Sequence, residues 1–266
     1  MPRFLPRREF VLAAPALALG SACSTPAPAP APATPAPTPA PAPSAGSAAA
    51  PRPWTDQPAY SIVRIEVRDG KAFGEYVAGH TPTIAAVGGS FVVAGARPQA
   101  VEGNWPNRLM VIHQWPNART FLDWYEGAAY APWKRIRHGA SSAEVVLVQG
   151  VAAADTMPAE APAFAVIDVE VRDGPAFGRY VQGHMPGLRA GGGAFLAAGG
   201  RHQVIEGSWN PRRIVMHRWP SAQAFRTWYE SEEYRPWRDL RWSAANTDVG
   251  LVAGLTAKAK AERGMP

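Results

Sequence analysis

Four histidines are the residues of this 266-residue chain with the clearest capacity for chemistry, because imidazole titrates near neutral pH. They are His80, His113, His184 and His217. Such a side chain can act as a general acid or base, or can bind a metal ion. Their spacing fixes no metal geometry, so we predict no metal site and no cofactor. Catalytic candidates and hydrogen-bonded structural histidines both remain open interpretations.

Two pairs of charged residues are candidates for ligand binding: Glu102 with Arg108, and Glu206 with Arg212. The planar fork of donors on Arg can orient an anionic or carbonyl-bearing ligand. The alternative is an ion pair that pins a hairpin. The aromatic candidates, which can line an apolar pocket, are Trp105, Tyr125, Trp209 and Tyr229.

The candidates occur in pairs because the chain contains an internal repeat. Residues 60–150 match residues 164–254 without a gap after a shift of 104 positions, with 43 identities in 91 positions. A repeat of this kind indicates a duplicated folding unit. We therefore predict two domains, at 57–150 and 162–255, joined by a linker at 151–161 and followed by a tail at 256–266.

Periodicity within one repeat predicts the order β-α-β-β-α-β, the ferredoxin-like unit of α+β proteins. Residues 60–67 alternate as a strand, and residues 70–87 place apolar side chains on one helical face before Gly88-Gly89. Strands such as 108–115 carry apolar residues on both faces, so each sheet needs a partner. Two tandem copies can supply it, which predicts a pseudo-dimeric α/β barrel within one monomeric chain.

The motifs of each repeat resemble domain of unknown function family 1330, a member of the dimeric α/β-barrel superfamily. They are GGxF, EGxW followed by an Arg, a strand that ends in aromatic-Pro, and WYE. Where the family has Glu-Phe-Pro at that strand end, this chain has His113-Gln114-Trp115-Pro116 and His217-Arg218-Trp219-Pro220, so an acid/base role of the Glu is either lost or has passed to His113 and His217. The superfamily includes cofactor-free monooxygenases, lactone isomerases and haem-binding dismutases, so the resemblance implies a fold without selecting a reaction.

The first 56 residues have the pattern of an export signal followed by a linker. Residues 1–23 combine Arg7-Arg8, a short apolar run and the chain's only cysteine, Cys23, in a pattern that resembles a twin-arginine signal with a lipobox. We expect lipidation of Cys23 and a membrane-anchored lipoprotein that faces the periplasm. Residues 24–56 are a linker rich in Pro and Ala, with 11 Pro at positions 26–53, and this composition favours polyproline II.

Net charge argues against nucleic acid as a partner. The formal charge of +6 falls to +4 without residues 1–22, which hold three Arg and one Glu, and no basic stripe remains. We therefore expect an exported, lipid-anchored protein that binds a small molecule, with isomerase- or monooxygenase-like activity as its enzymatic version. The alternative is a non-catalytic interaction or structural protein of the envelope, and the residues leave the choice between enzyme and binding protein open.

Overall fold

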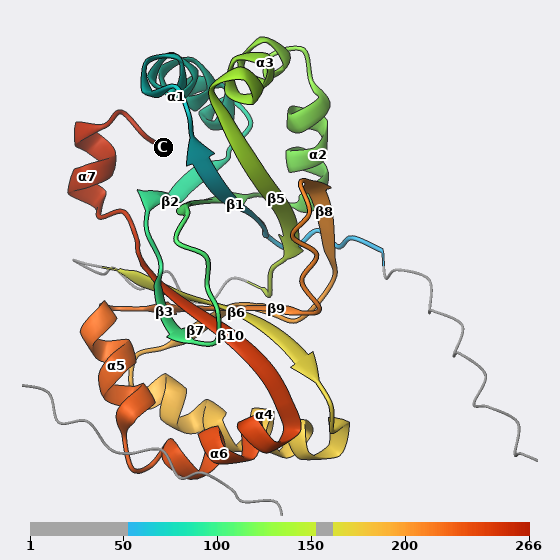
Figure 1. Cartoon of the computed structure of the whole chain (residues 1–266), viewed down its shortest axis with the longest axis vertical. Coiled ribbons are helices and arrows are strands. Elements are labelled where there is room, and N and C mark those ends of the chain that lie inside the picture. Colours follow the sequence, from blue (N-terminus) through green and yellow to red (C-terminus); the bar gives the residue numbers. More distant parts are fainter. Residues whose placement is uncertain (1–52, 153–161) are drawn as a thin grey trace, which may run out of the picture. The chain divides into compact units, whose positions relative to one another are not determined.

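The computed structural model describes residues 53–152 and 162–266 (Figure 1). The elements of the first repeat are β1 (Ala59–Val67), α1 (Gly70–Ala85), β2 (Ser90–Ala96), β3 (Gln99–Glu102), β4 (Leu109–Trp115), α2 (Ala118–Glu126), α3 (Ala131–Ala140) and β5 (Ser141–Gln149). Those of the second are β6 (Ala163–Val171), α4 (Gly174–Ala190), β7 (Ala194–Ala198), β8 (His202–Glu206), β9 (Ile214–Trp219), α5 (Ala222–Glu230), α6 (Arg235–Ala244) and β10 (Ala245–Ala253). Both repeats therefore contain the predicted order β-α-β-β-α-β, with a short strand (β3 or β8) added after the second strand and a further helix (α3 or α6) added before the last one.

The predicted first helix is confirmed, and its start has a local cause. The Asp69 carboxylate accepts hydrogen bonds from the Lys71 and Ala72 amides at the start of α1, which is the preferred role of Asp at a helix N-cap. Farther along, a Cβ on Gly79 would lie 2.2 Å from the ring of Trp133 in α3. Glycine is needed there because the Trp ring packs directly on the α1 backbone, and Gly183 and Trp237 repeat the arrangement.

Each sheet contains five strands, and one strand in each comes from the other repeat. The strand orders are β2-β4-β1-β5-β8 and β3-β10-β6-β9-β7. The short strand β3 pairs with β10, and β8 pairs with β5. The repeats thus exchange the strands that carry the EGxW motif, an exchange that the sequence analysis did not predict.

The predicted pairing of the two sheets is confirmed. One apolar cluster joins residues of both repeats, among them Ile62, Ile112, Val166 and Met216, all fully buried. Helices α1, α2 and α3 cover the outer face of the first sheet, and α4, α5 and α6 cover that of the second (Figure 1). The core therefore has a double sheet at its centre and a helix layer on each outer face, as in a dimeric α/β barrel held within one chain.

One helix lies outside the repeat pattern. The tail folds into α7 (Ala257–Glu262), which lies beside β2 and α1 (Figure 1). No helix in the described ranges is long and apolar enough to cross a membrane. The predicted signal and lipidation site at 1–23, and most of the two linkers, lie outside the described residues.

Candidate functional site

Each repeat has a pocket between its first helix and its sheet. In the second repeat this cavity has a volume of about 440 Å³, and in the first about 200 Å³. His184 and His217 line the pocket of the second repeat, and the aligned residues His80 and His113 line that of the first. The sequence-predicted catalytic candidates therefore come together, one pair in each repeat.

The histidine on the helix is held in the same way in both repeats. His184 Nδ1 lies 2.8 Å from the backbone oxygen of Tyr180, and His80 Nδ1 lies 2.9 Å from that of Tyr76. A carbonyl can only accept, so Nδ1 carries the proton and the Nε2 lone pair is left free. Burial lowers the pKa of both histidines, that of His80 to about 4, so both rings are neutral at pH 7.

The histidine on the strand differs between the repeats. In the first repeat the Ser61 hydroxyl lies 3.0 Å from His113 Nδ1 and accepts a hydrogen bond from Trp115 Nε1, also at 3.0 Å. Position 165, which aligns with 61, is Ala. Consequently Trp219 Nε1 and both ring nitrogens of His217 are buried without a partner in the described part of the chain.

Two further nitrogens of the second repeat are also unpartnered: His184 Nε2 and Arg241 Nε. In the first repeat the Arg137 Nε–H instead donates to the Tyr130 hydroxyl at 3.0 Å. Of the five equivalent atoms there, only His113 Nε2 is buried and unpaired within the described ranges. Native proteins seldom leave buried polar atoms unpaired, so such a group of five is typical of a site that receives a ligand or water.

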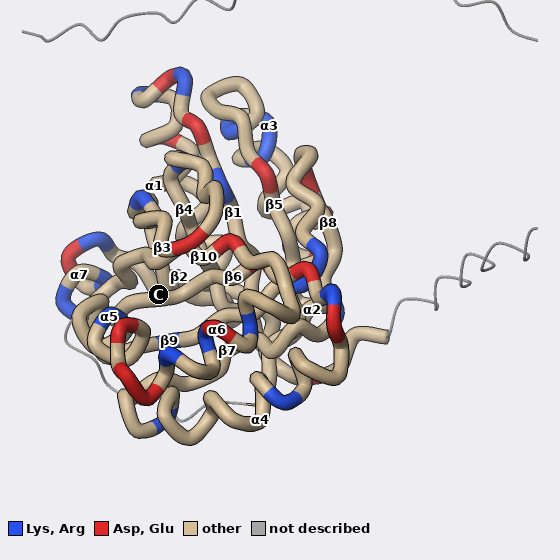
Figure 2. The backbone as a smooth tube through the Cα atoms, turned by 60° about the horizontal axis from the view of Figure 1, so that its bottom comes forward, with Lys and Arg blue, Asp and Glu red and all other residues tan. Residues whose placement is uncertain are grey.

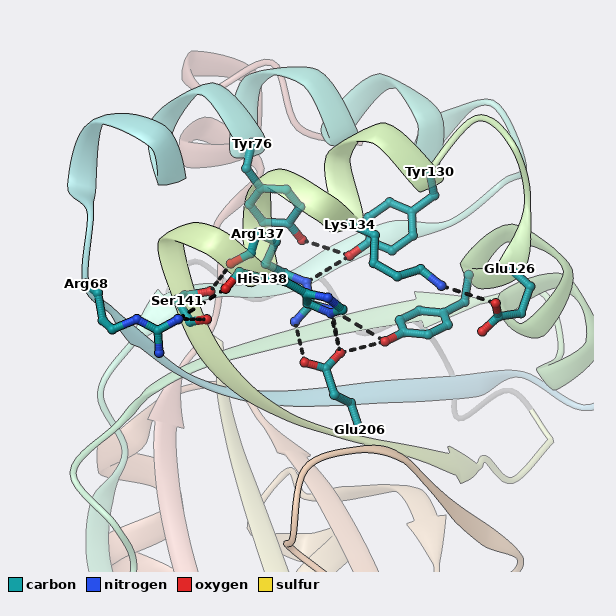
Figure 3. A network of polar contacts seen from close by, with 10 residues as sticks. Arg68, Tyr76, Glu126, Tyr130, Lys134, Arg137, His138, Ser141 and Glu206 are labelled. Atoms are coloured by element: carbon teal, nitrogen blue, oxygen red, sulfur yellow. Dashed lines mark hydrogen bonds and ion pairs between the residues drawn. The ribbon is translucent and has the colours of Figure 1, made fainter.

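The candidate glutamates do not pair with the arginines that follow them in sequence. Glu206, on the exchanged strand β8, reaches the helix layer of the first repeat, where it accepts from Arg137 at 2.5 and 3.1 Å and from the Tyr125 hydroxyl at 2.6 Å (Figure 3). Glu102 on β3 binds Arg241 and the Tyr229 hydroxyl in the same way. Each EGxW glutamate therefore neutralises a buried arginine of the other repeat.

This arrangement corrects the pairing expected within each hairpin. Arg108 lies 3.6 Å from Glu66 and 3.5 Å from Glu144, and Arg212 lies 4.0 Å from Glu170. The reason is the strand exchange, which carries each Glu away from the Arg that follows it in sequence. Burial by itself raises the pKa of Glu102, but hydrogen bonds from Arg241, Thr247 and Tyr229 outweigh it and lower the pKa to about 2.

The predicted tryptophans do not reach either pocket. Trp105 and Trp209 meet edge to face between the two sheets, with ring centroids 6.1 Å apart. Tyr125 and Tyr229 belong to the crossed ion pairs, through their hydrogen bonds to Glu206 and Glu102. Of the predicted ligand-binding residues, the structure therefore brings the Glu and Tyr together, and it places the Trp and Arg elsewhere.

Two determinants of the second-repeat pocket, Ala165 and Arg213, were not predicted from the sequence. Arg213 lines the pocket mouth, is exposed, and packs its aliphatic stem against Gly199, whose φ is +71°. Its guanidinium has no hydrogen-bond or ion-pair partner in the ranges described. The aligned residue of the first repeat is Leu109. The signal for both lies in the differences between the aligned repeats, because the residues that the repeats share predict identical pockets.

Charge elsewhere is mixed. In the view of Figure 2, Lys and Arg positions are interspersed with Asp and Glu positions along the described backbone. No group of three or more His, Cys, Asp or Glu within the described ranges is placed to hold a metal ion.

Comparisons with known proteins identify the fold unit. The model of the DUF1330 family, a domain of unknown function, matches residues 58–151 and again residues 162–255. No curated protein matches the chain.

Similar solved structures come from several kinds of protein. A candidate monooxygenase from Lactobacillus acidophilus is 14% identical, with 74% of this chain and 94% of that chain covered and a TM-score of 0.47. An anthrone oxidase-like protein is 12% identical, with 74% and 91% covered and a TM-score of 0.42. A haem-binding protein from Thermus thermophilus is 13% identical, with 81% and 99% covered and a TM-score of 0.41. Likeness at this level selects no chemistry.

Proposed function

Since the chain belongs to the DUF1330 family, in two copies, and the family has no assigned function, we propose a function from the site itself. The second repeat binds a small organic molecule with an apolar body and an oxygen at its buried end. The observation that carries this proposal is the group of five unpaired nitrogens of the second repeat, three of whose side chains line the pocket of about 440 Å³. Pockets for small ligands typically measure about 300–1,000 Å³ and combine apolar walls with a few polar groups.

The donors at the buried end favour an oxygen acceptor. Among the side chains that line the pocket, Arg241 Nε always carries a proton, and the neutral His217 ring carries one more. A carbonyl, enolate or phenolate oxygen can accept from such donors, whereas a hydrocarbon would leave them unpaired at a cost of about 1–3 kcal/mol each. The walls include Ile167, Phe177, Val181 and Phe195, which suit an aromatic or otherwise apolar body.

Arg213 extends the proposal to the outer end of the ligand. Its unpaired guanidinium at the pocket mouth supports binding of a ligand that also carries a negative charge. The distance between this cation and the buried donors then selects for molecules that are polar at both ends and apolar between them.

A reaction on the bound molecule is the enzymatic version of this proposal. The free Nε2 lone pair of His184 is suited to accept a proton from a carbon beside the ligand's carbonyl. Such a step begins isomerase-like and cofactor-independent monooxygenase-like chemistry. Solvent deuterium exchange into the bound ligand, measured by NMR, tests it: exchange should be lost in His184→Ala and retained in His80→Ala. Equal exchange in His184→Ala and the wild type contradicts a role for this histidine.

The binding proposal is tested on protein purified from its own host. We expect native mass spectrometry to show one organic molecule per chain, and absorption spectroscopy to characterise any chromophore in it. Val181→Trp should fill the second-repeat pocket and abolish binding, while the matched change Val77→Trp in the first repeat should preserve it. Equal binding by both variants contradicts the assignment to this pocket.

We also propose that the chain is exported and anchored to a membrane through lipid on Cys23, with the Pro- and Ala-rich residues as its spacer. The support is the sequence pattern around Arg7-Arg8 and Cys23. Metabolic labelling with an alkyne fatty acid should mark the wild type and not Cys23→Ala, and the variant should leave the membrane fraction. Equal labelling of Cys23→Ala contradicts the anchor.

A further inference from the structure

Residues 257–266 lie over the pocket of the first repeat. Helix α7 begins at Ala257, and the segment after it returns toward β2, where the Phe91 amide donates to the Pro266 carbonyl at 3.1 Å. Arg263 and Met265 are part of the pocket lining, and Met265 packs on the apolar cluster of the first repeat. The tail therefore occupies space that otherwise belongs to the pocket mouth.

In the second repeat, no segment of the described part of the chain covers the matching pocket. The walls correspond position by position: Phe73, Val77 and Phe91 in the first repeat match Phe177, Val181 and Phe195 in the second. The volume differs, at about 200 Å³ with the tail in place and about 440 Å³ without an equivalent segment in the lining. A cavity thus remains beneath the tail, and its wall residues match those of the second-repeat pocket.

The tail is held by few contacts. Before the helix, the Leu255 amide donates to the Val92 carbonyl at 2.9 Å, and after it the hydrogen bond from the Phe91 amide to the Pro266 carbonyl links the tail to the sheet. Lys258 and Glu262 of α7 are largely exposed, with 85% and 64% of their side-chain surface accessible. Segments with little buried apolar surface and exposed backbone open at low free energy, below that of global unfolding.

We infer that residues 257–266 cover a second binding site, which takes uncharged apolar molecules when the tail moves away. The apolar class follows from two differences between the repeats. Leu109 replaces the mouth cation Arg213, and Ser61 pairs with Nδ1 of the strand histidine, an atom that is unpaired in the described part of the second repeat. What remains exposed beneath the tail is chiefly hydrocarbon and aromatic surface.

The test uses the neutral fluorophore N-phenyl-1-naphthylamine and its binding stoichiometry. A chain that ends at residue 256 should bind one molecule more than the full chain, and adding Val77→Trp to the shortened chain should remove that additional site. Hydrogen exchange at the Phe91 amide should be slow in the full chain and faster in the shortened one. Met265→Asp in the full chain should raise the stoichiometry in the same direction, and Lys258→Ala should leave it unchanged.

The inference shares its wall comparison with the proposed function, but the two fail separately. Loss of binding in Val181→Trp concerns the second repeat alone, whereas the gain on shortening concerns the first. No gain in either the shortened chain or Met265→Asp overturns the covered site. A loss of probe binding when Val77→Trp is placed in the full chain also overturns it, because the first pocket would then be open with the tail present.

Discussion

The two pockets of this molecule share their apolar walls and the contact that holds the helix histidine, yet they differ at the strand histidine and at the mouth. In the first repeat a serine pairs the strand histidine and the tail lies over the mouth. In the second repeat the serine is Ala165, no segment among the described residues covers the mouth, and Arg213 lies beside it. After duplication, one copy can keep the fold while the other keeps the site, and differences between copies then identify function better than shared residues do.

The crossed ion pairs are what the two repeats share, and breaking them should have the largest effect. We expect Glu102→Ala to destabilise the fold by about 3–5 kcal/mol, because it leaves the Arg241 charge buried and unpaired. Glu206→Ala should cost less, since the Glu206 side chain is 23% exposed against 9% for Glu102. Urea unfolding measures both.

A control variant, and the helix in which the Glu102→Ala protein first loosens, test this prediction further. Glu66→Ala removes a carboxylate that is 64% exposed and should change stability by less than about 1 kcal/mol. Because the exchanged strand carries Glu102 to the other repeat, hydrogen exchange in Glu102→Ala should accelerate in α6 before α3. Faster exchange in α3 first would contradict the crossed arrangement.

The sequence predicted the repeat, the order of elements and the paired sheets, because these depend on local periodicity and on apolar residues at both faces of a strand. It did not predict that β3 and β8 change sheets. A strand of four or five residues with half-buried positions carries no pattern that says which edge it joins. The pairing of Glu102 with Arg108 was wrong for that reason, since it assumed that neighbours in sequence remain neighbours in space.

Exchanging serine and alanine at the aligned positions 61 and 165 should reverse the difference in hydrogen bonding at the two strand histidines. Ser61→Ala leaves His113 Nδ1 and Trp115 Nε1 unpaired and should cost about 1–3 kcal/mol. Ala165→Ser supplies the missing partner to His217 and Trp219, so we expect a gain of about 1 kcal/mol in the unliganded protein. The same variant should bind the natural ligand more weakly. Destabilisation by both substitutions would show that the two sites are packed differently.

Acid should destabilise both repeats through their strand histidines. Burial lowers the pKa of His113 and of His217 to about 3, against 6.5 in the unfolded chain. The unfolded state therefore binds protons that the native state does not, and stability that is full above pH 6.5 is lost as the pH falls toward 3. One such histidine contributes a slope of about 1.4 kcal/mol per pH unit in this window. His113→Gln and His217→Gln should each remove that slope from the urea-derived stability curve, and an unchanged slope would mean that the ring titrates normally.

Arg213 should produce the smallest effect and the most specific one. The probes 8-anilino-1-naphthalenesulfonate and N-phenyl-1-naphthylamine share one aromatic body and differ by a sulfonate, so their affinities isolate the contribution of charge. Arg213→Leu reproduces the first-repeat residue at this position. An exposed ion pair is worth about 0.2–1 kcal/mol, which corresponds to a loss of up to about fivefold for the sulfonate. Binding of the neutral probe should not change. Equal weakening of both probes would mean that Arg213 acts through the packing of its stem on Gly199. The unpaired nitrogens of the second pocket, rather than its charge, would then distinguish it from the first within the described ranges.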